Sequence, residues 1–312
     1  MQKYSKIIST GSHLPDKIYT NHDIEKFVDT SNDWIIERTG IEKRHIASES
    51  ESSVDMAHAA CIDAFKNCAI ELEDIEMIVV ATTTPERKFP STAVLLQNKL
   101  NNNSAFAFDI NAACTGFIYA LDIADKYIKG GFVKNALVVG TEKITSLLDW
   151  KDRNTCVLFG DGAGAVVLSS SDTPGIISNT IGSDGSYKDL LTVNTDTEVI
   201  EMKGNDVFKI AVNTMGKLAA STLEKNGFKV DDLDWLIPHQ ANSRIINAVA
   251  KKINLPEEKI VMTVNNHGNT SAASIPLALD YANKQQMIHK DNIIMFEAFG
   301  AGFTWGSTLL KF

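Results

Sequence analysis

The chain has 312 residues, of which 44% are hydrophobic and 22% are charged, a composition ordinary for a folded protein with a large core. No run of about 18 apolar residues is present, so the sequence excludes a membrane-spanning helix and predicts no membrane partner. The net charge of −9 repels phosphate backbones, which argues against a nucleic-acid partner.

The first residues and the cysteines indicate a cellular compartment. Residues 1–6 lack the apolar core and the small-residue cleavage site of a signal peptide, so we expect a cytoplasmic location. The cysteines, at positions 61, 68, 114 and 156, are widely spaced and form no C-x-x-C pair, which is typical of reduced thiols. We interpret Cys61 and Cys68 as core residues, because they lie seven apart on one face of a helical stretch.

Four apolar runs of strand length follow in chain order, at residues 77–81, 105–110, 136–140 and 163–168. They alternate with stretches of helical periodicity, which is typical of α/β layers around a largely buried sheet. Residues 160–164 are glycine-rich, but they lead into a strand rather than a helix, so we interpret them as sites of close backbone packing instead of a phosphate loop. The sequence contains no G-x-S-x-G, H-E-x-x-H or G-x-x-x-x-G-K-[ST] motif.

The chain also resembles itself. Residues 72–79 resemble residues 230–237, and residues 120–126 resemble residues 278–284, in both cases 158 positions later. The glycine-rich segments that begin at Phe159 and Phe299 are closer together than that, as expected if the first copy holds an extra loop around residues 143–158. These repeats predict two related halves, residues 1–171 and 172–312. The alternative is a chance likeness between two helix–strand units.

Residues 104–121 predict a strand, a short turn and an amphipathic helix, with Cys114 at or just inside the N-terminus of the helix. Free amide N–H groups and the positive end of the helix dipole favour a thiolate at such a position. In known cases the cysteine pKa falls to about 3.5–7.5. Cys114 is therefore a candidate nucleophile, and the alternative is a small buried apolar side chain.

Two polar turns in the second half carry further candidates. His239 follows an apolar strand directly, and the carboxyl end of a strand in an α/β sheet faces the usual ligand crevice. Residues 265–274, which include Asn269, hold more short polar side chains than capping of the helix expected near Leu277 requires. The repeat places this turn roughly opposite the turn of Cys114. For His239 alone, a capping or merely hydrogen-bonded imidazole is the alternative.

Motifs spread along nearly the whole chain resemble the thiolase-fold condensing enzymes, most closely the β-ketoacyl-acyl-carrier-protein synthase III family. The motifs are TSNDWIIERTGI (30–41), FPSTA (89–93), DINAACTGF (109–117), DRNT (152–155), FGDGAGA (159–165), IPHQAN (237–242), HGNTSAAS (267–274) and FGAGFTWG (299–306). The resemblance implies an α/β fold of five layers, α/β/α/β/α, built from two halves related by a pseudo-twofold axis.

The resemblance also implies a catalytic triad of Cys114, His239 and Asn269. The Cys114 thiolate attacks an acyl-CoA thioester and releases CoA, while the backbone N–H groups of Cys114 and Ala301 hold the oxyanion. A malonyl thioester then loses carbon dioxide, and His239 and Asn269 donate hydrogen bonds to the enolate oxygen, for which the Nε2 atom of His239 must be protonated. We expect no full proton relay for the thiolate, and no metal or redox cofactor. Ala301 stands where the family often has glycine.

Other positions match the family's binding residues. Trp34 and Arg153 are expected on either side of the CoA adenine, as an aromatic ring and a guanidinium stack well. Further matches are Thr30, Arg38 and Asn242 for CoA; Phe89, Phe159, Leu191 and Met202 for the acyl pocket; and Lys209, Arg244, Lys251 and Lys252 for the acyl carrier protein. Phe89 is expected to reach the pocket of a partner subunit, which implies a homodimer. The basic residues alone are equally consistent with a solvated surface.

The sequence therefore predicts an initiating condensing enzyme of type II fatty acid synthesis, which joins acetyl-CoA or another short acyl-CoA to malonyl-acyl carrier protein. The nearest alternative is a secondary-metabolite relative with the same triad but a different acyl donor or acceptor. A non-catalytic CoA-binding module is a weaker alternative, because such a protein normally lacks a triad residue and this chain retains all three.

Overall fold

The computed structural model describes residues 4–312, so residues 1–3 of the segment tested for a signal peptide lie outside it. One sheet has the strand order β1-β7-β6-β4-β5, with bounds Tyr4–His13, Gly162–Ser171, Asn135–Glu142, Met77–Ala81 and Phe106–Ile110. The other has the order β11-β12-β13-β8, with bounds Trp235–Pro238, Ile293–Gly300, Thr304–Lys311 and Ile176–Ser183. All four strands predicted in the first half are confirmed, with ends that differ by a few residues.

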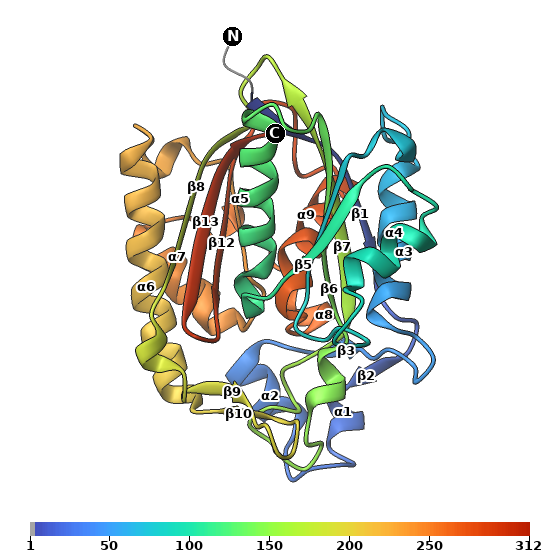
Figure 1. Ribbon diagram of the computed structural model, residues 1–312. Coiled ribbons are helices and arrows are strands. Elements are labelled where there is room, and N and C mark those ends of the chain that lie inside the picture. The colour runs from blue at the N-terminus through green and yellow to red at the C-terminus, as the bar shows by residue number, and fades with distance from the viewer. Residues whose placement is uncertain (1–3) are drawn as a thin grey trace.

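The helices form three layers around these two sheets (Figure 1). Helices α5 (Gly116–Lys129) and α9 (Ser274–Lys284) lie between the sheets, α3 (Ser53–Phe65) and α4 (Thr92–Lys99) cover the outer face of the first sheet, and α6 (Gly204–Lys225) and α7 (Ser243–Ile253) cover the second. The expected five-layer α/β fold is therefore confirmed. Helix α9 begins at Ser274, earlier than the expected Leu277, because Pro276 falls in its first turn, where a missing N–H costs nothing.

Four strands of each sheet repeat one topology, and β5 is an additional strand of the first sheet. In each sheet two neighbouring strands pair in parallel (β4 with β6, β11 with β12), and two antiparallel strands follow in the sheet. Met77 pairs with Ala136, and Trp235 pairs with Ile294, so equivalent pairs are separated by the offset of 158 found in the sequence. Residues 143–161 join β6 to β7, whereas only 301–303 join β12 to β13. Each sheet takes its strands from one side of residue 171, and that boundary itself stays a prediction.

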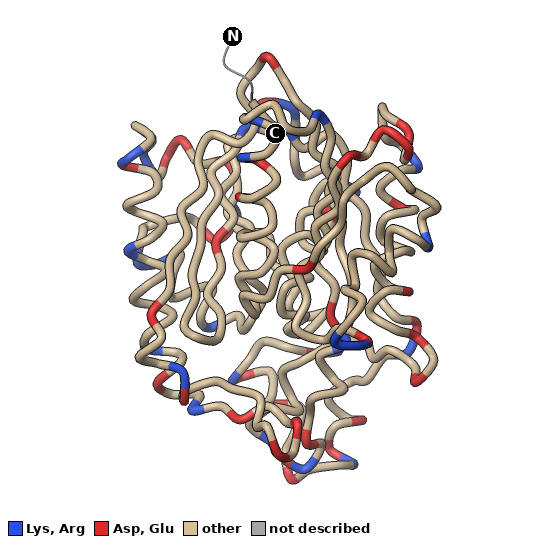
Figure 2. The backbone as a smooth tube through the Cα atoms, viewed as in Figure 1, with Lys and Arg blue, Asp and Glu red and all other residues tan. Residues whose placement is uncertain are grey.

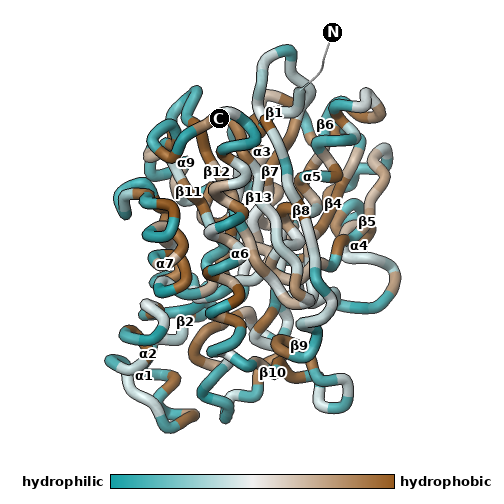
Figure 3. The backbone as a smooth tube through the Cα atoms, turned by 90° about the vertical axis from the view of Figure 1, so that its left-hand side faces the viewer, coloured by the Kyte–Doolittle hydropathy of each residue, from teal (hydrophilic) through white to brown (hydrophobic). Residues whose placement is uncertain are grey.

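The core lies on both sides of the central helices. Phe117 of α5 packs against Phe296 of β12 with ring centroids 6.5 Å apart, so side chains of the two halves share one apolar cluster. Charged residues lie mainly on the outer helices and loops (Figure 2), and α6 alternates hydrophilic and hydrophobic segments along its length (Figure 3). Among residues 4–312 no helix is both long enough and apolar enough to cross a membrane.

Shorter elements gather at one end of the layers, at the bottom of Figure 1. They are β2 (Ile18–Thr20), α1 (Asn21–Ile24), α2 (Asn32–Thr39), β3 (Lys43–His45), β9 (Leu191–Val193), β10 (Ile200–Met202) and α8 (Val264–His267). Cys114 and His239 follow the carboxyl ends of strands β5 and β11. The shorter elements lie around these two residues, at the same end of the layers.

The contact between Gly140 of β6 and the short helix η7 (Ser271–Ala273) gives a test of how closely the halves pack. A Cβ atom at Gly140 would lie 2.3 Å from the Ala272 carbonyl oxygen, and neither backbone can yield. We expect Gly140→Ala to lower the free energy of unfolding by about 1–3 kcal/mol, measured by denaturant titration. Gly185→Ala, where a Cβ meets nothing within 4 Å, is the control and should unfold like the parent. Equal stability of the two variants would contradict this packing.

Candidate active site

Cys114 lies in the 3-10 turn η2 (Ala113–Thr115) between β5 and α5. The glycine at position 300 brings the second half against this turn, because a Cβ there would lie 2.9 Å from the Cys114 amide nitrogen. The Thr304 hydroxyl lies 3.0 Å from the Ala112 carbonyl oxygen and also within hydrogen-bond distance of Thr115. The nucleophile candidate is therefore held by contacts from both halves of the chain.

His239 follows β11 and is buried. Its backbone N–H donates to the Glu297 carbonyl oxygen at 2.7 Å, and its ring Nδ1 lies 2.7 Å from the Ser274 hydroxyl. Burial lowers the pKa of His239 to about 3, so the ring is neutral at physiological pH. When Ser274 donates to Nδ1, the single ring proton resides on Nε2, which is the tautomer that can donate to a substrate oxygen.

Asn269 is buried and is anchored by the first half. Its backbone N–H donates to the Leu158 carbonyl at 2.8 Å, and its own carbonyl accepts from the Gly160 N–H at 3.0 Å. The side-chain Oδ1 accepts from the Ser271 N–H at 2.9 Å. This hydrogen bond fixes which way the amide faces, so the Nδ2 group is left to donate.

The structure brings the three predicted catalytic residues together. Cys114, His239 and Asn269 line one cavity of about 450 Å³, although they come from three separate turns of the sequence. Cys114 and Ala301 also line a second cavity of about 880 Å³. The nucleophile candidate therefore stands where two cavities meet, so one molecule can reach the sulfur from each side.

The expected depression of the Cys114 pKa is wrong. Burial, together with the charge of Glu142, raises the pKa of the Cys114 thiol to about 11, and a hydrogen bond with the Ser271 side chain offsets only part of this rise. The residue keeps some exposure because it lines both cavities, yet protein surrounds it closely. At neutral pH the resting group is a thiol, and its proton needs an acceptor before the sulfur can attack.

The predicted CoA residues line the mouth of the smaller cavity, except Thr30. Trp34, Arg38, Arg153 and Asn242 all contribute to its wall. The Arg153 guanidinium lies 4.8 Å from the Trp34 ring centroid, so a base that inserts between the two side chains must displace the guanidinium. Asn242 also caps α7 by accepting from the Arg244 N–H, and it donates to the Arg38 carbonyl at 3.1 Å.

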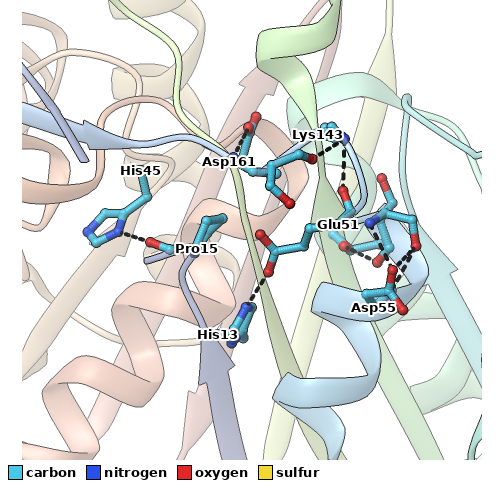
Figure 4. Close-up of polar contacts among 12 residues, drawn as sticks. His13, Pro15, His45, Glu51, Asp55, Lys143 and Asp161 are labelled. Carbon is cyan, nitrogen blue, oxygen red and sulfur yellow. Dashed lines mark hydrogen bonds and ion pairs between the residues drawn. The ribbon is translucent and has the colours of Figure 1, made fainter. Parts of the chain in front are cut away.

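The expected acyl-pocket residues fall into two groups. Phe159 and Leu191 line both cavities, and Met202 lines the smaller one. Phe89 lines neither and is 85% exposed. The larger cavity is also lined by Glu49, Ser52 and Ser53. The Lys143 ammonium holds this loop, because it donates to the carbonyls of Ser48 and Glu51 (Figure 4).

The four basic residues predicted to dock a carrier lie on two adjacent helices. Arg244 of α7 lines the smaller cavity and stacks over Phe208 of α6 at 5.5 Å. Lys252 donates to Asn213 of α6 at 2.6 Å, while Lys209 and Lys251 are exposed on α6 and α7. Together these four residues, which we call the basic patch, extend from the cavity mouth along the α6–α7 surface.

Sequence reasoning missed three residues that support the triad. Ser271 and Ser274 lie inside the HGNTSAAS motif, so the density of polar residues there was the available signal. Glu142 ends the buried strand β6, and nothing in the sequence placed it near Cys114. Within residues 4–312, no group of three or more His, Cys, Asp or Glu side chains is arranged to hold a metal ion.

Comparisons with known proteins agree with the fold. Residues 108–185 match the family model described as 3-oxoacyl-[acyl-carrier-protein (ACP)] synthase III, and residues 223–312 match the model of its C-terminal region. The chain is 52% identical to β-ketoacyl-[acyl-carrier-protein] synthase III of Thioalkalivibrio sulfidiphilus, with 99% of each chain covered, and 51% identical to that of Methylococcus capsulatus over both full lengths. A crystal structure of 3-oxoacyl-[acyl-carrier-protein] synthase III from Aquifex aeolicus is 48% identical, with a TM-score of 0.97 over 99% of this chain and 100% of that one.

The protonation state of Cys114 is directly testable. Because burial raises the pKa of this thiol, we expect Cys114 to contribute no thiolate absorbance at pH 7. Its thiolate absorbance should appear only as the pH approaches about 11. The measurement is the ultraviolet difference spectrum between the parent and Cys114→Ser over a pH titration. A thiolate signal from Cys114 already present at pH 7 would show that the helix end outweighs burial.

Proposed function

The chain belongs to the 3-oxoacyl-[acyl-carrier-protein] synthase III family and is an initiating condensing enzyme of fatty acid synthesis, and on this basis we propose how its residues carry out the reaction. The substrates are acetyl-CoA or another short acyl-CoA and malonyl-acyl carrier protein. The observation that carries the proposal is the convergence of Cys114, His239 and Asn269 on one cavity. The relatives at about 50% identity over the full length do not favour a secondary-metabolite role.

In the first half-reaction, the Cys114 sulfur attacks the acyl-CoA carbonyl and the bond from that carbon to the CoA sulfur breaks. The developing oxyanion accepts hydrogen bonds from the backbone N–H groups of Cys114 and Ala301. The close approach of Gly300 to the Cys114 amide supports this pairing of donors. Only the backbone of Ala301 takes part, so its methyl group in place of the family's usual hydrogen is compatible with the role.

In the second half-reaction, malonyl-acyl carrier protein enters the smaller cavity and loses carbon dioxide. His239 Nε2–H and Asn269 Nδ2–H donate to the thioester oxygen as it gains enolate charge, and the carbanion then attacks acyl-Cys114. The hydrogen bonds that Ser274 and Ser271 make to the other ends of these side chains support the assignment. Both donors are neutral, so they favour the charge without a prior proton transfer.

CoA is proposed to bind across the cavity mouth, with its adenine between Trp34 and Arg153 and its pantetheine arm beside Asn242. Insertion of the base separates the Arg153 guanidinium from the Trp34 ring and exchanges one stacking contact for two. Arg38 lies 5.8 Å from the same ring and supplies positive charge for the CoA phosphates. Thr30 does not line the cavity, and its contact with CoA is likewise proposed.

A homodimer is proposed from the edge of the first sheet. Strand β5 is an edge strand, and Phe106 on it and Phe132 nearby in the fold expose 44% and 77% of their surface. An unpaired apolar edge of this kind favours pairing with a second copy. Asp109 of β5 accepts from the first N–H groups of α4, which holds the preceding Phe89 loop beside this edge. Phe89 is then placed to enter the partner's acyl pocket.

The test of the proposed function uses intact mass and carbon dioxide release. On mixing with acetyl-CoA, we expect one acetyl adduct on the parent and none on Cys114→Ala, because the adduct is a thioester of that sulfur. His239→Ala and Asn269→Ala should still acquire the adduct. They should release carbon dioxide from malonyl-acyl carrier protein at least about 100-fold more slowly, as expected when an oxyanion donor is removed.

Each variant serves as a control for another in this experiment. Labelling of His239→Ala and Asn269→Ala shows that they are folded and bind the acyl donor. Equal labelling of the parent and Cys114→Ala would overturn the nucleophile, and normal carbon dioxide release by both of the other variants would overturn the assigned donors.

The proposed docking surface is the basic patch, because it adjoins the cavity mouth and the acyl carrier protein is acidic. Charge reversal in Arg244→Glu/Lys251→Glu should raise KM for malonyl-acyl carrier protein about tenfold, since electrostatic attraction to the carrier is lost. KM for malonyl-CoA should change less. The matched control, Lys229→Glu/Lys290→Glu, changes the net charge equally at exposed positions outside the patch. Equal KM changes for the two substrates would reject the patch.

A further inference from the structure

The larger cavity has a wall built from two segments that are far apart in the chain. Glu49, Ser52 and Ser53 come from the segment that leads into α3, and residues 83–86 come from the turn that follows β4. The Ser53 hydroxyl donates to the Thr84 carbonyl oxygen at 2.7 Å, so the two segments meet. We call these residues together the two-segment wall.

The carboxylate of Glu142, at the end of β6, holds the second of these segments. It accepts from the Thr83 N–H at 3.1 Å, the Thr83 hydroxyl at 3.0 Å and the Thr84 hydroxyl at 2.7 Å. The next residue adds a contact, because the Lys143 N–H donates to the Thr84 hydroxyl at 2.8 Å. Glu142 is fully buried and does not line the cavity, so it supports the wall from behind.

The ammonium group of Lys143 holds the first segment. It donates to the carbonyl oxygens of Ser48 at 2.7 Å, Glu49 at 3.3 Å and Glu51 at 2.8 Å (Figure 4). An ammonium group has three N–H donors, so one side chain directs all of them to a single loop. The Glu51 carboxylate also lies 2.8 Å from Nε2 of His13 in β1 (Figure 4).

The two ends of this loop are fixed without the Lys143 ammonium. The Ala47 N–H donates to Asp161 at 2.8 Å, and the Thr141 hydroxyl donates to the Ser53 carbonyl oxygen at 2.8 Å. Residues 48–50 between these ends are exposed. Loss of the ammonium therefore frees the middle of the loop to turn its carbonyls toward water, while the elements on either side stay in place.

The wall offers few free polar groups to a molecule in the cavity. The hydroxyl groups of Ser52, Thr83 and Thr84 donate to carboxylates, and that of Ser53 donates to a backbone carbonyl. The buried apolar residues that line the same cavity are Ile144, Phe159 and Ile200. Because the lining hydroxyls are already paired, the cavity suits a hydrocarbon chain.

We propose that Lys143 is a positioning residue that selects the acyl chain, because it holds the 48–51 side of the two-segment wall while Glu142 holds the 83–84 side. The inference rests on the proposed function, in which CoA occupies the smaller cavity. An acyl group on Cys114, which lines both cavities, then extends into the larger one. A fixed wall packs against methylene groups that an acetyl group lacks, so Lys143 favours a medium-length chain over acetyl.

The test is a competition between two acyl donors. The enzyme is mixed with equal concentrations of acetyl-CoA and octanoyl-CoA and quenched early, and intact mass gives the ratio of octanoyl to acetyl adducts. In Lys143→Met we expect this ratio to fall about tenfold below that of the parent, as when about two methylene groups lose a packed wall. Only folded protein forms either adduct, so partial unfolding leaves the ratio unchanged.

Three further variants make the competition specific. Lys143→Arg keeps a cation with several N–H donors and should give a ratio nearer to that of the parent than Lys143→Met does. Thr84→Val removes the hydroxyl that joins Glu142 and the Lys143 N–H, and it should lower the ratio from the other side of the wall. The control, Lys290→Met, removes a positive charge at an exposed position between α9 and β12 and should keep the parent's ratio.

The outcomes separate this inference from the proposed function. Failure of the parent to form either adduct would contradict the proposed function itself. If the parent is acetylated but takes no octanoyl group, or if Lys143→Met keeps or raises the parent's ratio, selection by the wall is overturned and the proposed function stands. Should Lys143→Met form neither adduct, an unchanged or higher ratio in Thr84→Val would overturn the inference in its place.

Discussion

The contact between the turn of Cys114 and the 300–304 segment is the constraint on which the site depends. A glycine at position 300 and the Thr304 hydroxyl press the second half of the chain against the backbone that carries the nucleophile. The two N–H groups proposed to hold the oxyanion, those of Cys114 and Ala301, come one from each half, so the proposed oxyanion site needs both halves. The repeated topology places both segments at the same end of the layers, so the site follows from how the two sheets face each other.

Burial sets the chemistry of this site in a single direction. It raises the pKa of Cys114, lowers that of His239 and raises that of Glu142, so each group favours its neutral form. Neutral donors suit an enolate, whose charge appears only during the reaction. The same burial denies Cys114 a ready thiolate at neutral pH.

Much of the fold was predictable from the sequence. The apolar runs at residues 77–81 and 136–140 became β4 and β6, and the offset of 158 reappeared between equivalent strand pairs. These features are local or repeat at fixed intervals, and strand periodicity and duplication are written directly in residue order. The resemblance to a known family then pointed to Cys114, His239 and Asn269, which the structure gathers at one cavity.

The sequence by itself determined the alternation of strands and helices and the repeat, because these rest on residue type and spacing. The layer order and the three residues proposed to react came from the motifs that resemble a known family. Only the tertiary structure decided the protonation of Cys114 and the presence of Glu142 near it. A pKa depends on which charges and how much water lie within a few ångströms, and those neighbours come from strands and turns far apart in the chain. Helix position alone misjudged the thiol for that reason.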